Sequence, residues 1–382
     1  MKIAMLGHKR IPSREGGIEV VVEELAARMA AMGHEVTCYN RRGRHIGGDE
    51  FAEADQTMKE YRNIRIKWVP TLDRRGLAAF TAAISASVCT LFNGYDIVHF
   101  HAEGPSVMCW LPKLFGKKVV VTIHGLDHRR GKWGKLAKSV IIVGEKCAAR
   151  WADAVIVLSE DVRRYFKDTY GLETKLIYNG ASETQKRRPE LISKRYGLSG
   201  GDYLLYLGRL VPEKGIDSLI RAYRQNDTDK KLVIAGGGSD SGDYVKKLHE
   251  MADGDERIIF TGFVQGQTLE ELYSNAYIYI LPSLLEGMPL SLLEAMSYGC
   301  CCLTSDIPEC TDVTGDAGFS FKAGDSDDLD KMLTKLCASG ELCAEYGEKA
   351  EKRVLSLFSW DKTTKQTLEV YESVLERGKK RR

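Results

Sequence analysis

Two series of short apolar runs most constrain the fold of this chain. The first series is KIAMLG, HEVTCYN, IRIKWVP, DIVHFH, KKVVVTIHG and ADAVIVLS, and the second is DYLLYLG, KKLVIAGG, RIIFTGF, YIYILPS and CCCLTS. Most neighbouring runs are separated by segments in which apolar residues recur at helical spacing. Strands that alternate with helices form parallel sheets covered on both faces, so the two series predict two doubly wound α/β domains.

The domain boundary is expected in the polar interval 180–189, GASETQKRRP, which carries no periodicity. A chain of 382 residues is longer than one core usually sustains, which also favours two domains. We therefore expect an N-terminal domain over residues 1–182 and a C-terminal domain that begins at residue 183 and ends at residue 360.

Composition excludes some classes of protein. There are 55 basic and 53 acidic residues, a formal net charge of +2, which argues against a nucleic-acid binder that works by bulk charge. The ten cysteines are scattered rather than set in CxxC pairs. The consecutive Cys300, Cys301 and Cys302 are interpreted as small buried side chains of a reduced, cytosolic protein.

Two segments are candidates for secretory or membrane-spanning sequences, and neither is predicted to be one. The opening MKIAMLGHKR has too short an apolar run for a secretory signal. The stretch from Gly76 to Tyr95 carries no charge and is long enough to raise a transmembrane helix. Nine of its 20 residues are Ala, Ser or Thr, so we favour a buried helix on a sheet face.

Ligands of doubly wound sheets bind beyond the carboxyl ends of the strands. Gly16 and Gly17 follow the first run and precede a helix, where backbone N–H groups and the helix dipole can hold an anion; an ordinary turn is the alternative. The fingerprint G-x-G-x-x-G is absent there, which argues against a redox dinucleotide site. His124 follows another strand, a position where histidine is more often structural but could meet a ligand in a cleft.

The second series adds two cations and two acids. Arg209 and Lys214 in YLGRLVPEKGID flank a turn before a helix, which suits a diphosphate, although a solvated basic loop would look the same. In EGMPLSLLE, Glu286 has the S-x-x-E spacing of a capping box with the preceding serine. Pro289 favours a helix start at its own position instead, which leaves Glu286 in a loop and Glu294 on the second helical turn.

These segments resemble a known family. LPSLLEGMPLSLLEAMSYGCCCLTSDIPE, with LGRLVPEKGID and IAGGGSD before it and FSWDKTTKQTLEVYESVL near the end, is similar to the retaining nucleotide-sugar glycosyltransferases of family four. The N-terminal half is similar to bacterial members that build capsules, O-antigens and exopolysaccharides. The resemblance implies the GT-B fold, in which two Rossmann-like domains face a central cleft. It also implies that a C-terminal helix, here over residues 361–382, returns to the N-terminal domain of residues 1–182.

The resemblance also implies roles for individual residues. Arg209 and Lys214 would bind the donor diphosphate, Glu286 hydroxyls of the transferred sugar and Glu294 those of the ribose. His124 would lie near the donor sugar and affect turnover. The remaining expected donor contacts, made chiefly by the backbone, are Gly16, Gly17, Phe263, Val264, Gly287, Met288, Pro289 and Leu290. This chain departs from the pattern at one turn, where Met288-Pro289 stands in place of the Phe-Gly of many members.

The expected reaction moves a sugar from a nucleoside-diphosphate-sugar to an acceptor hydroxyl with retention of configuration, without a cofactor or a metal. DSDD, Asp325 to Asp328, resembles an acidic metal motif, but a solvated turn or helix start is favoured. A nucleotide-sugar epimerase of similar fold is the main alternative. A glycoside hydrolase would leave Arg209 and Lys214 without a task, and a non-catalytic sugar-binding regulator is the remaining class.

The expected partners are the nucleotide-sugar donor and a saccharide acceptor, which could be lipid-linked; no nucleic acid is expected. Basic residues occur in the N-terminal domain, around Trp133, and in the closing RGKKRR; those near the tryptophan are Arg129, Arg130, Lys132, Lys135 and Lys138. A solvated face is the default, and binding to anionic lipid is the competing hypothesis. The expected location is the cytoplasm, either free or on the inner face of the cell membrane.

Overall fold

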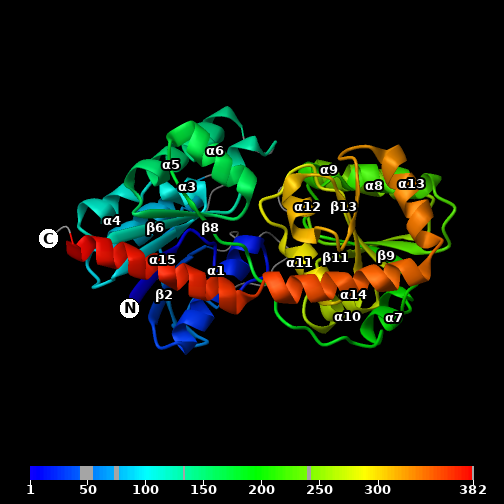
Figure 1. Ribbon diagram of the computed structural model, residues 1–382, viewed down its shortest axis with the longest axis horizontal. Helices are drawn as coiled ribbons and strands as arrows, with labels where there is room; N and C mark the ends of the chain where they lie inside the picture. The colour runs from blue at the N-terminus through cyan, green and yellow to red at the C-terminus, as the bar shows by residue number, and fades with distance from the viewer. Residues whose placement is uncertain (44–54, 73–76, 132–133, 239–241, 381–382) are drawn as a thin grey trace. The chain divides into compact units, whose positions relative to one another are not determined.

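A computed structural model describes residues 1–43, 55–72, 77–131, 134–238 and 242–380. The chain divides into two compact units (Figure 1). The N-terminal unit contains Met1–Asn179 and Trp360–Arg382, and the C-terminal unit contains Gly180–Ser359. Both are Rossmann-like α/β structures with mostly parallel sheets, as the sequence predicts. The C-terminal unit begins at Gly180, three residues before the position 183 expected from the sequence.

The sheet of the N-terminal unit has the order β3-β4-β2-β1-β5-β6-β7-β8, and only the β3–β4 pair is antiparallel. Its strands are β1 (Lys2–Leu6), β2 (Glu35–Arg41), β3 (Glu60–Tyr61), β4 (Ile64–Val69), β5 (Ile97–His101), β6 (Lys118–Ile123), β7 (Ala154–Val157) and β8 (Lys175–Leu176). The order reverses between β1 and β5. In such sheets this topological switch point is where ligands bind.

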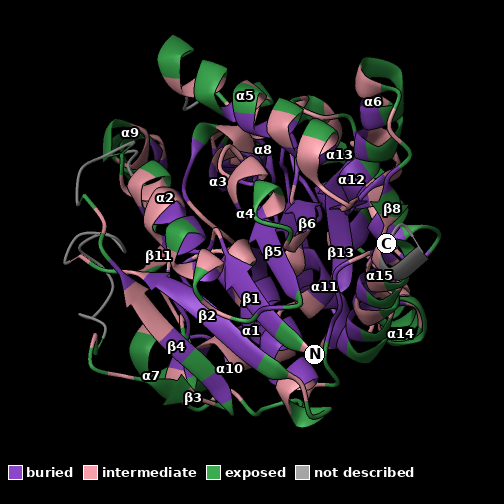
Figure 2. Cartoon of the chain, turned by 90° about the vertical axis from the view of Figure 1, so that its left-hand side faces the viewer, coloured by how far each residue is buried: buried purple, intermediate pink, exposed green. Residues whose placement is uncertain are grey.

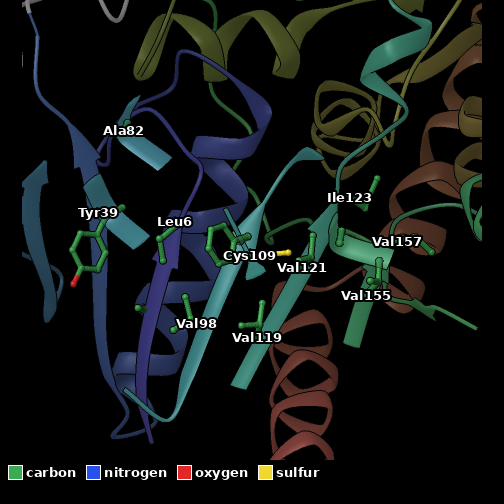
Figure 3. Close-up of a cluster of buried hydrophobic side chains, with 14 of the residues drawn as sticks. Leu6, Tyr39, Ala82, Val98, Cys109, Val119, Val121, Ile123, Val155 and Val157 are labelled. Atoms are coloured by element: carbon green, nitrogen blue, oxygen red, sulfur yellow. The ribbon is translucent and has the colours of Figure 1, made fainter. Parts of the chain in front are cut away.

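Helices cover this sheet, and their packed faces complete its core. They are α1 (Gly17–Ala31), α2 (Ala78–Leu91), α3 (Glu103–Ser106), α4 (Trp110–Leu114), the 3₁₀ turn η1 (Asp127–Arg129), α5 (Lys135–Trp151), α6 (Glu160–Tyr170) and α15 (Trp360–Lys380). Figure 3 shows Leu6, Val98, Val119 and Val121 side by side in the core on β1, β5 and β6. In Figure 2 these central strands are buried, and exposed residues lie on the outer sides of the helices.

Helix α2 accounts for most of the uncharged stretch at residues 76–95. Ala82 and Ala86 join the core cluster, so one side of α2 packs on the sheet as expected. Within the described ranges, no helix is both long enough and apolar enough to cross a membrane.

The C-terminal helix α15 belongs to the N-terminal unit. It contacts α1 and β6, and Figure 1 shows it, in red, beside α1. Tyr371 on α15 is fully buried, and its hydroxyl lies 2.6 Å from Nδ1 of His99 on β5. The expected return of the C-terminal helix to the N-terminal domain is therefore confirmed.

The C-terminal unit has an all-parallel sheet of order β11-β10-β9-β12-β13-β14. Its strands are β9 (Tyr203–Leu207), β10 (Lys231–Ala235), β11 (Ile258–Gly262), β12 (Ile278–Leu281), β13 (Cys301–Ser305) and β14 (Phe319–Phe321). Its helices are α7 (Leu191–Tyr196), η2 (Pro212–Lys214), α8 (Ile216–Gln225), α9 (Gly242–Ala252), α10 (Gln267–Asn275), α11 (Leu290–Ser297), α12 (Pro308–Thr314), α13 (Ser326–Cys337) and α14 (Gly340–Leu357). The order reverses between β9 and β12, which defines a second switch point.

Cysteines pack inside this unit as small apolar residues. Cys300, Cys301 and Cys302 are all buried, although neighbouring strand residues point to opposite faces, because helices cover both sides of β13. None of the ten cysteines forms a disulfide.

Candidate functional site

The loops that follow β9, β10 and β12 meet at the switch point of the C-terminal unit. Gly236, directly after β10, has φ +145°, and a Cβ there would lie 1.8 Å from the carbonyl oxygen of Gly208. Leu284, after β12, donates its N–H to the carbonyl of Glu213 in η2 at 2.8 Å. Backbone contacts therefore hold the three loops together before any side chain is considered.

Lys214 and Glu286 form an ion pair across two of these loops. The Lys214 ammonium donates to Oε1 of Glu286, and the Ser283 hydroxyl donates to the same oxygen at 2.6 Å. Their side chains are only 13% and 8% exposed. The fold thus supplies Glu286 with a basic partner that lies far away in the sequence. Ser283 contacts Glu286, but no helix begins there, so the capping-box interpretation is wrong.

Helix α11 begins at Leu290 after Pro289, as the sequence predicts. Glu294 lies on its second turn, and Oε2 of Glu294 accepts a hydrogen bond from Tyr273 on α10 at 3.1 Å. Tyr273 is buried, which raises the pKa of its hydroxyl. Tyr273 was not among the sequence-predicted residues, because a tyrosine on the apolar face of a helix resembles a core residue.

The other residues of this unit that were expected to contact the donor differ in how far they are buried. Arg209 is half-buried after β9, and its carbonyl accepts a hydrogen bond from the Tyr206 hydroxyl at 2.9 Å. The residues Gly287, Met288 and Pro289 are buried, and Leu290 is half-buried. Phe263 and Val264 follow β11, the edge strand, with β10 and β9 between it and β12.

The predicted glycines of the N-terminal unit stand at the start of α1. Gly16 is the N-cap and Gly17 the first helical residue. Glu19 of the first turn accepts the N–H of Lys9 at 2.8 Å, and its other oxygen lies 2.6 Å from where a Cβ of Gly16 would be. A carboxylate therefore already occupies part of the positive end of this helix.

His124 follows β6 and is half-buried beside two buried histidines, His101 and His99. Its Nε2 lies 3.0 Å from Nδ1 of His101, and the ring of His101 lies 4.2 Å from that of His99. Burial lowers the pKa of His124 to about 4, so its imidazole is neutral near pH 7. His101 and His99 were not among the sequence-predicted residues, since they alternate with apolar residues inside a strand.

One group among the described residues has the composition and spacing to hold a metal ion: Glu103, His128 and Glu145, whose ligand atoms lie within 4.8 Å of one another. The DSDD motif, by contrast, forms the start of a helix. The Asp325 carboxylate caps α13 by accepting the N–H groups of Asp327 and Asp328, both at 3.1 Å, so the expected helix start is confirmed.

The basic residues of the N-terminal unit are partly paired. Arg129 contacts Asp161 at 3.2 Å, and Arg130 contacts Asp127 at 2.9 Å. Lys135 and Lys138 lie in the first turn of α5 beside an exposed Leu136. Lys132 and Trp133 are outside the described residues, as are the side chains of 379–382 at the closing basic run.

Comparisons with known proteins agree with this architecture. Residues 15–185 match the family described as Glycosyltransferase Family 4, and residues 189–353 match Glycosyl transferases group 1. An uncharacterized glycosyltransferase of Methanocaldococcus jannaschii is 25% identical over 98% of this chain and 99% of its own. The N-acetyl-alpha-D-glucosaminyl L-malate synthase of Bacillus anthracis is 26% identical over 94% of each chain.

Solved structures show the same fold. HepE of Anabaena, in complex with UDP and glucose, matches with a TM-score of 0.80 at 19% identity, over 98% of this chain and 100% of its own. Sucrose-phosphate synthase of Thermosynechococcus elongatus matches with a TM-score of 0.81 at 21% identity, over 98% and 99%. None of these names is that of an epimerase, so that alternative gains no support. The two family models match consecutive parts of the chain, and the solved structures share its fold over nearly its whole length. The chain therefore belongs to the family four glycosyltransferases of GT-B fold, similar to bacterial polysaccharide enzymes.

Proposed function

We propose that this glycosyltransferase moves a sugar from a nucleoside-diphosphate-sugar to an acceptor hydroxyl with retention of anomeric configuration, in the assembly of a capsule, O-antigen or exopolysaccharide. The observation that carries the proposal is the ion pair between Lys214 and Glu286 at the β9–β12 switch point. It joins a cation suited to a phosphate and an acid suited to sugar hydroxyls, at the edge of the sheet where ligands bind.

The donor would occupy the loops that surround this pair. Arg209 and Lys214 would bind the diphosphate, helped by the backbone at the start of α11, where the helix dipole favours negative charge. Glu286 would accept hydrogen bonds from the sugar, and Glu294, held by Tyr273, from the ribose. On binding, the phosphate would replace Glu286 as the partner of the Lys214 ammonium.

The proposed step breaks the bond between the anomeric carbon and the leaving phosphate oxygen. The acceptor oxygen bonds to the same face of that carbon, and the acceptor proton passes to the departing phosphate. Charge builds up on the phosphate oxygens, so positioned cations lower the barrier. Loss of one such group is expected to slow the reaction about a hundred- to a thousandfold. In this proposal the step uses no metal and no cofactor.

A thermal-shift panel with UDP, GDP and dTDP tests the donor site. A nucleoside diphosphate at about a hundredfold its Kd adds about 2.7 kcal/mol, enough to raise the Tm by several degrees. Arg209→Ala should remove most of the shift. Arg221→Ala, which changes an exposed arginine paired with Asp217 on α8, should keep it. The donor site is refuted if no nucleoside diphosphate shifts the wild-type protein, or if Arg209→Ala keeps the full shift.

Retention and donor use need product analysis. The donor is incubated with a glycan acceptor and the product is analysed by NMR. The anomeric configuration of the transferred sugar should match that of the donor. An opposite configuration would exclude same-face attack. Conversion of the donor sugar to its epimer without any acceptor would instead support the epimerase.

The acceptor is proposed to be a saccharide, which a lipid anchor could hold at an anionic membrane. Lys135, Leu136 and Lys138 at the start of α5 are the described residues that suit such a surface, each basic residue being worth about 1 kcal/mol. Vesicles with and without anionic lipid should separate wild type from the pair Lys135→Glu and Lys138→Glu. The matched pair on α9, Lys246→Glu and Lys247→Glu, should float like wild type. Equal flotation in both vesicles removes this partner.

A further inference from the structure

Three side chains from separate elements converge inside the N-terminal unit. Glu103 begins α3 after β5, His128 lies in η1 after β6, and Glu145 lies on α5. Nδ1 of His128 is 3.1 Å from Oε2 of Glu145 and 3.9 Å from Oε1 of Glu103. None of these three atoms has a hydrogen-bond partner in the described part of the chain. Three buried polar atoms therefore face one another at short distances without a well-aligned hydrogen bond between them.

The outer oxygens of the two carboxylates are fully engaged. Oε2 of Glu103 accepts the N–H of Asp127 at 2.9 Å. Oε1 of Glu145 accepts the hydroxyl of Tyr165 at 2.8 Å and that of Tyr170. These bonds orient each carboxylate so that its second oxygen faces the shared centre, which is the arrangement that outer partners give to metal ligands.

Burial makes the unsatisfied centre costly. Glu103 and Glu145 are 0% exposed. Two buried carboxylates repel each other, and either a shared proton or a cation between them relieves the repulsion. The arginines of the neighbouring loop pair with other acids, Arg129 with Asp161 and Arg130 with Asp127.

Close helix packing brings the two acids together. A Cβ on Gly144 would lie 1.9 Å from the carbonyl oxygen of Glu103, so only glycine lets α5 approach α3 this closely. The next residue along α5 is Glu145. The backbone is therefore shaped to bring the carboxylates to one centre.

We propose that Glu103, His128 and Glu145 bind one divalent transition-metal cation. Two carboxylate oxygens and one imidazole nitrogen are ligands that Zn²⁺ and Mn²⁺ accept, and two carboxylates balance the charge of the ion. The ion ties η1 to α3 and α5. It thereby fixes the segment that begins at His124, and it takes no part in the transfer step.

Titration of metal-free protein with Mn²⁺ and Co²⁺ tests the site. Mn²⁺ favours oxygen and nitrogen ligands over the thiols of the ten cysteines. One ion per chain is expected, with a Co²⁺ spectrum that lacks thiolate charge-transfer bands. His128→Ala should abolish stoichiometric binding, whereas His249→Ala, in the C-terminal unit, should not. Tyr170→Phe should weaken binding about ten- to a hundredfold, as loss of an outer partner does.

Circular dichroism shows whether each variant is folded. His128 is partly exposed, so His128→Ala decides the question if Glu145→Gln does not fold. Absence of stoichiometric Mn²⁺ and Co²⁺ binding overturns the proposal, and so does wild-type affinity in both His128→Ala and Tyr170→Phe. In either case the two carboxyl groups share a proton instead. The thermal-shift panel with nucleoside diphosphates tests the C-terminal unit, whereas the metal titration tests the N-terminal unit. A failure of the donor site can therefore be distinguished from a failure of the metal site.

Discussion

The carbonyl oxygen of Pro282 lies 2.1 Å from the position that a Cβ on Gly215 would occupy. Gly215 also has φ +65°, in the left-handed region that L side chains rarely adopt. Glycine therefore lets the η2 turn lie against the end of β12. This approach brings Lys214, the preceding residue, within reach of Glu286.

Gly215→Ala should destabilise the C-terminal unit by more than the left-handed conformation alone costs. The matched control is Gly197→Ala, because Gly197 has φ +62° with nothing within 4 Å of its Cβ position. The control should lose about 1–2 kcal/mol of unfolding free energy in urea, and Gly215→Ala clearly more. Equal losses would show that the loop after β12 moves aside freely.

Breaking the pair of Lys214 and Glu286 from one side should be costly. Lys214→Met or Glu286→Gln is expected to lower stability by about 3 kcal/mol, since each removes one charge of a buried ion pair. The double variant should lose less than the sum of the two. The exposed pair of Lys246 and Glu250 supplies the control cycle, with coupling below about 1 kcal/mol. Additive losses at Lys214 and Glu286 would mean that the pair has no coupling.

Mild acid should destabilise the N-terminal unit. Burial lowers the pKa of His8 and His124 to about 4 and of His99 to about 3, and that of His101 falls well below 6.5. The unfolded chain takes up these protons near pH 6.5, so the stability they contribute is present above that pH and lost as pH falls toward 4. Each histidine removes about 1 kcal/mol per pH unit in this window.

In the metal-free protein Glu103 acts in the opposite direction, because burial raises the pKa of its carboxyl to about 10. One such group does not offset four histidines. Urea midpoints at pH 6.5, 6.0 and 5.5 should therefore fall with pH. A constant or rising midpoint would show that the histidines are protonated in the folded protein.

Tyr371→Phe should loosen α15 without changing its apolar surface. The substitution removes the hydroxyl partner of the buried Nδ1 of His99, a loss of about 1–3 kcal/mol. Hydrogen exchange of α15 should accelerate, whereas Tyr346→Phe, a half-buried position of the C-terminal unit, should change neither unit much. Unchanged exchange would place the anchor of α15 in its apolar contacts alone.

Much of the fold could be predicted from the sequence because β-branched runs and helical spacing are local signals. All eleven predicted runs contain strands of the two sheets. The short strands β3, β8 and β14 were missed, since two or three residues carry no period. Helix α11 was placed correctly because Pro289 is itself a helix-start signal.

The sites were only partly accessible to sequence reasoning. Lys214 and Glu286 could be named singly, but their contact depends on which strands are neighbours, and β9 and β12 are not consecutive. Glu103, His128 and Glu145 have no shared spacing, so no motif could find them. Tyr273 and His101 were hidden for a related reason: inside an element, a polar residue on the buried face resembles core.

The split of the N-terminal unit between the two ends of the chain sets an order on folding. A ribosome completes every residue of the C-terminal unit before it reaches Tyr371. Until α15 is synthesised, β6 and His99 lack the helix that covers them in the folded protein. The C-terminal unit, although made second, can therefore reach its native structure first, against the usual order of synthesis. A nascent chain arrested before residue 360 would expose an unfinished N-terminal surface for as long as translation stalls.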